Sequence, residues 1–135
     1  MPRMSYPRFF SVAEAPESVL ALVGDLLPRL LEGEHPNLVV LREQLRRATV
    51  TRVELTGVGF FVGFSVPDGL RRTEPKRLVG GNAEISLSGV EHGAGCVLFV
   101  EDGRLSLFEG YTFDEEWPAD ARVTAVEHVK ALAPG

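Results

Sequence analysis

Cysteine is almost absent from this sequence, since Cys96 is the only one among 135 residues. An intramolecular disulfide is therefore excluded, and so is a zinc site built from several thiolates. Long apolar runs are also missing, because no stretch approaches the ~18 apolar residues that a membrane-spanning helix needs. The first dozen residues hold no apolar segment of secretory length. We therefore expect a cytoplasmic protein that does not associate with membranes.

Lysine and positive charge are scarce as well. Only Lys76 and Lys130 are lysines among the fourteen basic residues, and the formal net charge is -5. Nonspecific nucleic-acid binding needs clustered Lys and Arg to neutralise phosphates. The one local basic segment, residues 71–77, is interrupted by Glu74 and Pro75 and has no aromatic residue nearby for base stacking. We expect no nucleic-acid partner.

What remains is the composition of an ordinary folded domain. Hydrophobic residues make up 44% of the chain and charged residues 24%, whereas disordered chains have fewer apolar residues and more net charge for their length. A chain of this size buries roughly two-thirds of its unfolded surface. We therefore predict a single domain over residues 1–135. An irregular arm is expected over 1–12, and a long loop rich in proline and glycine over 65–82.

Apolar spacing predicts two helices in the N-terminal third of the chain. Pro16 is placed to open the first helix, and apolar residues follow at helical spacing up to Leu30. Pro28 should kink or end this helix, because proline lacks the N–H that a helix interior requires. A second helix should begin at Pro36. A short third helix is expected over residues 119–132.

The middle of the chain changes to an apolar period of two, which is typical of strands. Residues 50–55 and 58–64 should form a hairpin around a two-residue turn at 56–57, with Val53, Phe60 and Val58 on its core face. The Asp-Gly pair at 102–103 predicts a type I′ turn between two further strands. The order of elements predicts an α+β fold. Its two N-terminal helices should pack on a curved, mostly antiparallel sheet of about five strands.

Glu109 is the leading candidate for a functional residue. A two-residue turn at 102–103 pairs Cys96 with Glu109 and places the carboxylate on the apolar face of Leu98. A carboxylate there is desolvated and its pKa is raised unless a cation or a donor meets it. Such groups cluster at functional sites, where they act as general acids or bases. The alternative is a structural glutamate near the sheet rim, bonded to Tyr111, a loop amide or an arginine.

Four other positions complete the set of candidates for a pocket or an interface: Tyr111, Glu84, His92 and Trp117. The first three would line a pocket with Glu109 between helix and sheet. His92 lies four residues before Cys96 with no further ligand close by in the sequence, so we predict no metal site and no cofactor. Trp117 follows the acidic residues 114–116. It is either an interface aromatic or a packing residue that caps the core.

Several segments resemble a widespread group of small bacterial proteins with no established function. The stronger likeness lies in GAGCVLF (93–99), EGYTFDE (109–115) and WP (117–118), and weaker likeness extends over roughly residues 20–120. These segments are mostly turn glycines and strand residues. The resemblance therefore implies a bacterial origin and an α+β fold, and it adds no mechanism. Cys96 stands where that group is expected to have a larger apolar residue, which argues against an essential thiol.

Two functions fit these observations. The strands on either side of the turn at 102–103 are apolar on both faces, and a chain of this length has little helix to cover both. Exposed apolar area of this kind marks an interface. We therefore predict a non-catalytic binding or protein-interaction module, acting as a homodimer or with a protein partner through a sheet face or the acidic aromatic segment 111–117. The alternative is a small ligand-binding protein or enzyme with a pocket around Glu109.

Overall fold

The computed structural model describes residues 8–10, 15–127 and 129–135. Its elements in chain order are β1 (Arg8–Phe10), α1 (Glu17–Leu30), α2 (Pro36–Arg47), β2 (Thr49–Leu55), β3 (Gly59–Ser65), β4 (Leu78–Leu87), β5 (Ala94–Glu101), β6 (Arg104–Thr112), β7 (Val123–Glu127) and β8 (Ala133–Pro134). The predicted α+β fold with two N-terminal helices is confirmed. The eight-stranded sheet has more strands than the five expected.

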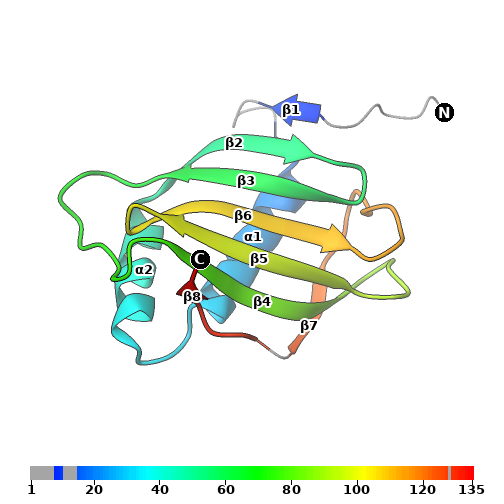
Figure 1. Ribbon diagram of the computed structural model, residues 1–135. Coiled ribbons are helices and arrows are strands. Elements are labelled where there is room, and N and C mark those ends of the chain that lie inside the picture. The colour runs from blue at the N-terminus through cyan, green and yellow to red at the C-terminus, as the bar shows by residue number, and fades with distance from the viewer. Residues whose placement is uncertain (1–7, 11–14, 128) are drawn as a thin grey trace.

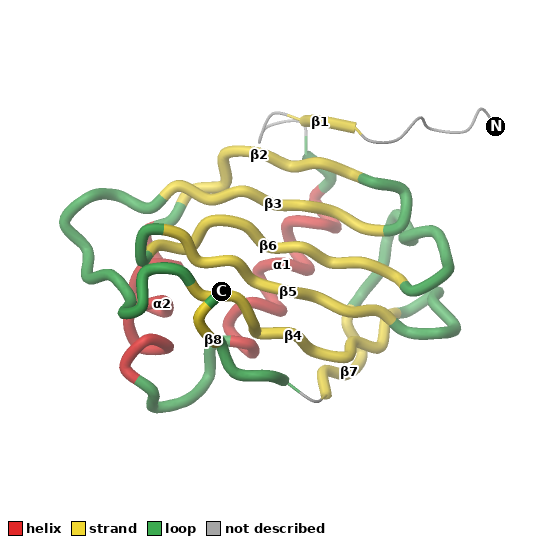
Figure 2. The backbone as a smooth tube through the Cα atoms, viewed as in Figure 1, coloured by secondary structure: helices red, strands yellow, loops and turns green. Residues whose placement is uncertain are grey.

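The strands form one antiparallel sheet with both helices on a single face. The strand order is β1-β2-β3-β6-β5-β4-β7, and β8 pairs with β4. Figure 1 and Figure 2 show α1 running behind the middle of the sheet and α2 behind one end of it. No described helix covers the opposite face, which is turned toward the viewer. We call the helix side the inner face and the other side the outer face.

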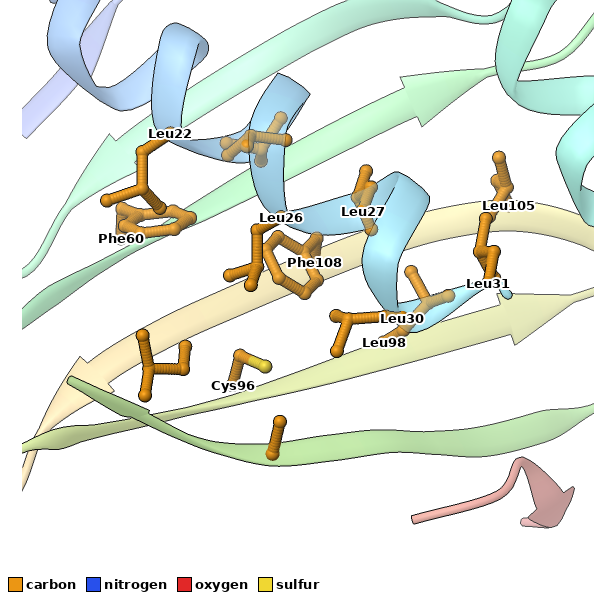
Figure 3. Packing of buried hydrophobic residues seen from close by; sticks show 14 of the residues in the cluster. Leu22, Leu26, Leu27, Leu30, Leu31, Phe60, Cys96, Leu98, Leu105 and Phe108 are labelled. Atoms are coloured by element: carbon orange, nitrogen blue, oxygen red, sulfur yellow. The ribbon is translucent and has the colours of Figure 1, made fainter. Parts of the chain in front are cut away.

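Helix α1 supplies the centre of the core. Its buried side chains follow the predicted helical spacing: Val19, Leu22, Val23, Leu26, Leu27 and Leu30. Figure 3 shows Leu22 next to Phe60 of β3 and Leu26 next to Phe108 of β6. Full burial of such a side chain contributes about 1.5–3 kcal/mol. The apolar stripe of α1 therefore holds the helix on the inner face.

Pro28 does not end α1, which was one of the two outcomes expected of it. The helix continues to Leu30, and the N–H of Leu31 still donates to the carbonyl oxygen of Leu27 at 3.1 Å. Pro28 is exposed and lies in the last turn. Its ring therefore points to solvent, and its missing N–H removes only one hydrogen bond near the end of the helix.

Gln44 joins α2 to the sheet. Its side chain is 0% exposed. The amide Nε2 donates to the carbonyl oxygens of Gly103 at 2.8 Å and Arg71 at 2.9 Å, and Oε1 accepts from the N–H of Leu105 at 2.9 Å. One side chain therefore connects α2 with the loop before β4 and with the β5–β6 hairpin. Helix α2 itself begins at Pro36, as predicted.

The two predicted hairpin turns have different outcomes. Asp102 and Gly103 have φ values of 52 and 70, both positive as a type I′ turn requires, so this prediction is confirmed. The turn after β2 is longer than two residues, because Leu55 pairs with Phe60. Val58 consequently lies in the turn and is 48% exposed, so its predicted place in the core is wrong.

The two ends of the chain also differ from expectation. Residues 119–132 contain β7 instead of a helix, and β-branched residues such as Val123 and Val126 favour that strand. Arg8–Phe10 of the predicted arm pair with β2. The rest of the arm, 1–7 and 11–12, lies outside the described residues. The long loop spans 66–77, because the residues that follow it belong to β4.

Candidate functional site

A β-bulge in β6 decides which way Glu109 points. The register between β5 and β6 shifts close to the turn, which leaves Ser106 as the extra residue of β6. An extra residue moves every later side chain of the strand to the other face. Glu109 therefore pairs with Val97 and lies on the outer face. The prediction that it shares a face with Cys96 and Leu98 is wrong.

Apolar side chains surround Glu109 on the outer face. In one row Glu109 lies between Phe61 of β3 and Val97 of β5, and in the next row Leu107 pairs with Phe99. Val97 is itself buried, with 8% exposure, but none of these neighbours belongs to the core cluster on the inner face or to the residues packed against it. We define the outer patch by six residues: Phe61, Val97, Phe99, Leu107, Glu109 and Tyr111.

The carboxylate of Glu109 is poorly compensated in this position. Among the described residues, none donates a hydrogen bond to it or forms an ion pair with it, and desolvation alone raises its pKa. Burial in apolar surroundings disfavours the ionised form of a carboxyl group. The direction of the predicted pKa shift is therefore confirmed, although the residue lies on the other face of the sheet.

Glu109→Gln should stabilise the protein at pH 7. Folding raises the pKa of Glu109, so the protonated carboxyl group contributes its full share of stability below the unfolded-state pKa. That contribution is lost as the pH rises through the folded-state pKa. Glutamine stays neutral and avoids that loss. Since Glu109 is only partly buried, solvent screening limits the gain to about 0.5 kcal/mol. Urea unfolding at pH 7 and pH 4 measures it, and the gain should shrink at the lower pH.

Glu101→Gln is the control for this measurement. Glu101 is exposed and lies 3.4 Å from Arg77 in an ion pair, so its replacement should bring no gain. A clear loss of stability in Glu109→Gln at pH 7 would show that the carboxylate is a structural acceptor, contrary to this description.

Tyr111 lies across Gly95 on the outer face. A Cβ atom at Gly95 would come within 2.7 Å of the Cζ and hydroxyl oxygen of Tyr111, so the glycine makes room for the ring. Phe113 packs edge-on against the same ring, with centroids 6.0 Å apart. Desolvation is the largest cause that raises the pKa of Tyr111, and the nearby charges of Cys96 and Glu109 add to it.

Gly95→Ala should push the ring of Tyr111 into solvent. The new methyl group collides with the far end of a side chain that can rotate away, so the expected loss of stability is only about 1 kcal/mol. The pKa of Tyr111 should fall toward its ordinary value, because the ring is solvated. Phenolate absorbance measures this in a Tyr6→Phe background. In the control Gly63→Ala, whose Cβ would lie 3.5 Å from Arg52, the titration should not change. An unchanged titration in Gly95→Ala would contradict the placement.

Glutamates outnumber arginines in the rows around the patch. The strand register places Glu54, Glu84 and Glu127 on the outer face with Glu109. Two arginines of the described strands, Arg52 and Arg104, lie on this face by the same register, and Arg104 pairs with Glu101. The outer face is therefore acidic around an apolar centre.

The fold separates the residues predicted for the site. Three share the outer face: Glu84, Glu109 and Tyr111. His92 lies at the end of that face, with Nδ1 at 3.1 Å from Asp114 and 3.2 Å from Glu115. Trp117 packs edge-on against Phe60 of the core, with the ring centroids 5.1 Å apart. Of the two roles expected for Trp117, this contact is the packing role. The cluster around His92 was missed, because no spacing in the sequence relates its two loops.

The thiol of Cys96 is unsuited to nucleophilic chemistry. Its side chain is buried on the inner face, and its Sγ donates to the carbonyl oxygen of Gly81 at 3.6 Å. Burial raises its pKa to about 11. The reactive form of cysteine is the thiolate, so a thiol that stays protonated at neutral pH is inert.

Three grooves of the described chain lie away from Glu109. One of about 580 Å³ separates α1 from residues 120–123. Another of about 420 Å³ lies between the end of α1 and residues 129–132, and a third of about 130 Å³ lies beside Trp117. The predicted pocket around Glu109 is not one of these grooves.

Comparisons with protein-family models, curated proteins and solved structures find no significant match. The resemblance to small bacterial proteins therefore stays a prediction. In the part of the chain that the structure describes, neither helix has the length and apolar character needed to cross a membrane.

Proposed function

We propose that this chain is a non-catalytic protein-interaction module, which binds a partner with a basic surface through the outer patch. The observation that carries the proposal is Glu109, a carboxylate without a described partner among apolar side chains on a face that no described helix covers. A lysine or arginine of a partner placed over Glu109 would compensate its desolvation. The same contact would bury Phe61, Phe99 and Leu107.

Charge favours a basic partner over a second copy of the chain. In a two-fold symmetric dimer the same surface faces itself, so its glutamates approach one another. The register of the described strands places Glu54, Glu84, Glu101, Glu109 and Glu127 on this face against two arginines, Arg52 and Arg104. Like charges repel across an interface, whereas opposite charges steer association and fix its register. The predicted homodimer is therefore the alternative occupant of the same face.

The size of the outer face suits a small protein interface. Five strands, β2 to β6, at a spacing of about 4.8 Å span ~24 Å, and seven residues at about 3.3 Å each span ~23 Å. The projected area is therefore of the order of 550 Å². Protruding side chains raise the accessible area toward the ~800 Å² that each partner of a stable complex buries.

A pocket for a small ligand or a catalytic acid at Glu109 has less support. The grooves of about 580, 420 and 130 Å³ lie on other parts of the molecule. Small-molecule sites are concave and enclose most of their ligand, whereas Glu109 lies on an open sheet face.

Affinity purification from cells that naturally make the protein tests the proposal. The tagged wild type is compared with Glu109→Arg and Phe99→Asp, which reverse the charge and the polarity of the outer patch. Arg46→Glu, on the exposed side of α2, is the control. We expect recovery of one basic protein to fall at least tenfold in both patch variants and to stay unchanged in the control. Recovery of a second copy would replace the basic partner by a homodimer, and equal recovery by every variant would contradict the proposal.

A further inference from the structure

Two loops bring an imidazole and three carboxylates together at one end of the sheet. Glu91 and His92 lie between β4 and β5, and Asp114 and Glu115 follow β6. Figure 2 shows these loops at the same end of the sheet as the β2–β3 turn. One donor atom each of Glu91, His92 and Glu115 lies within 4.8 Å of the other two. The Nδ1 atom of His92 lies 3.1 Å from Oδ1 of Asp114 and 3.2 Å from Oε1 of Glu115.

Backbone hydrogen bonds hold both loops in place. The N–H of Thr112 donates to Val58 at 2.7 Å, and the N–H of Trp117 donates to Gly57 at 2.9 Å, so the segment after β6 is fastened to the β2–β3 turn at both ends. The N–H of Glu91 donates to the carboxylate of Glu115 at 3.0 Å and joins the two loops. The donor groups are therefore positioned by the fold.

One imidazole nitrogen faces two carboxylates in this arrangement. The Nδ1 atom of a histidine carries at most one hydrogen, yet carboxylate oxygens of Asp114 and Glu115 both face it. The two carboxylates therefore share one ring hydrogen, the N–H of Glu91 is a further donor to Glu115, and the carboxylate of Glu91 adds a third negative charge nearby. Donor atoms bound to one metal at about 2.0–2.2 Å lie ~3.0–3.4 Å apart. The distances of 3.1 and 3.2 Å around Nδ1 fit that spacing, and they equally fit hydrogen bonds of His92 in the absence of a metal.

We infer that Glu91, His92 and Glu115 form a site for a divalent transition metal, with Asp114 as a further donor. An imidazole ligand favours Zn²⁺, Ni²⁺ or Co²⁺, whereas Mg²⁺ and Ca²⁺ prefer sites made of oxygen alone. The side chains of His92 and Asp114 are 58% and 62% exposed and that of Glu115 is 25% exposed, so the ion enters from solvent and water completes its coordination.

A bound metal would link the β4–β5 loop to the segment after β6. It would also neutralise part of the negative charge at this end of the outer face. The site does not depend on the function proposed for the outer patch, because none of its ligands belongs to that patch. The sequence predicted no metal here, since its ligands come from two separate loops.

Calorimetric titration of tag-free, chelator-treated protein with Zn²⁺ tests the inference. We expect one equivalent to bind saturably at pH 7. His92→Gln and Glu115→Gln should each weaken binding at least tenfold. His35→Gln and Glu116→Gln are matched controls that remove a histidine and a neighbouring glutamate outside the cluster, and they should bind like the wild type.

A second measurement locates the ion. Broadening of amide NMR signals by Ni²⁺ should be confined to residues 91–93 and 113–116 at low occupancy. Thermal unfolding without metal should be similar for the wild type and both ligand variants, because the side chain of His92 is 58% exposed and a glutamine at position 115 can still accept from the N–H of Glu91. Absence of saturable Zn²⁺ binding would overturn the inference. Binding that survives in His92→Gln, or that Mg²⁺ reproduces with equal affinity, would overturn it as well.

Discussion

Gln44→Leu should lower the free energy of unfolding by about 3 kcal/mol. The side chain is 0% exposed and satisfies three backbone groups, the carbonyls of Gly103 and Arg71 and the N–H of Leu105. Leucine has a similar size, so the core stays filled, but the carbonyl of Arg71 and the N–H of Leu105 lose this partner, while the carbonyl of Gly103 keeps only the N–H of Thr73 at 3.0 Å. Each unsatisfied buried group costs about 1–3 kcal/mol. Small shifts of the loop and entry of water should keep the total loss of stability below the sum of these individual costs.

Urea unfolding followed by circular dichroism measures this loss. The matched control is Glu43→Gln, one residue earlier on α2, which removes only the exposed ion pair with Arg71. Exposed ion pairs contribute about 0–1 kcal/mol, so this variant should remain close to the wild type. A loss below about 1 kcal/mol in Gln44→Leu would contradict the role of Gln44 as the link between α2 and the β5–β6 hairpin.

Gly59→Ala should destabilise the protein by about 3 kcal/mol or more, and only part of the variant should be recovered as folded protein. A Cβ atom at Gly59 would lie 1.9 Å from the carbonyl oxygen of Gly110 and 2.8 Å from the Cα atom of Tyr111. Both are backbone atoms of β6, which cannot rotate out of the way. Strands β3 and β6 would have to separate at the row that holds Tyr111.

Thermal unfolding and the soluble yield measure the effect of this substitution. Gly24→Ala is the control, because Gly24 is exposed on α1 and a Cβ there meets nothing within 4 Å. Alanine in a helix interior is favoured over glycine by about 0.5–1 kcal/mol, so this control should be stabilised. A Gly59→Ala variant as stable as the wild type would contradict the close approach of β3 and β6.

Local patterns predicted much of the fold. Apolar spacing identified α1, because one face of that helix is buried against the sheet along its whole length. The Asp-Gly pair at 102–103 identified its turn, because type I′ geometry needs positive φ at both residues. The C-terminal strands were missed, since the segment that holds β7 has no clear alternation and its pairing with β4 comes from distant sequence.

The candidate site was predicted in part, and a single residue explains the error. Glu109 was identified as a carboxylate with a raised pKa, which the structure confirms. Its face was wrong because Ser106 forms a bulge. A polar residue between Leu105 and Leu107 fits plain strand alternation equally well, so no local signal reveals the extra residue.

Long-range contacts explain what else could not be predicted. His92 and Asp114 lie 22 residues apart, and Gln44 reaches Gly103 across 59 residues. Neither pair has a fixed spacing that a sequence pattern would reveal. These contacts follow from the strand order, in which β6 is inserted between β3 and β5.

Site-specific photo-crosslinking in living cells tests the central claim most directly. A photoreactive phenylalanine analogue replaces Phe99 in the outer patch, and in a second protein it replaces Arg46 on α2. We predict a discrete adduct with a basic protein from position 99, its loss when Glu109→Arg is added, and no such adduct from position 46. The absence of an adduct at position 99, or the same adduct from both positions, would contradict the assignment of the outer patch as the binding surface.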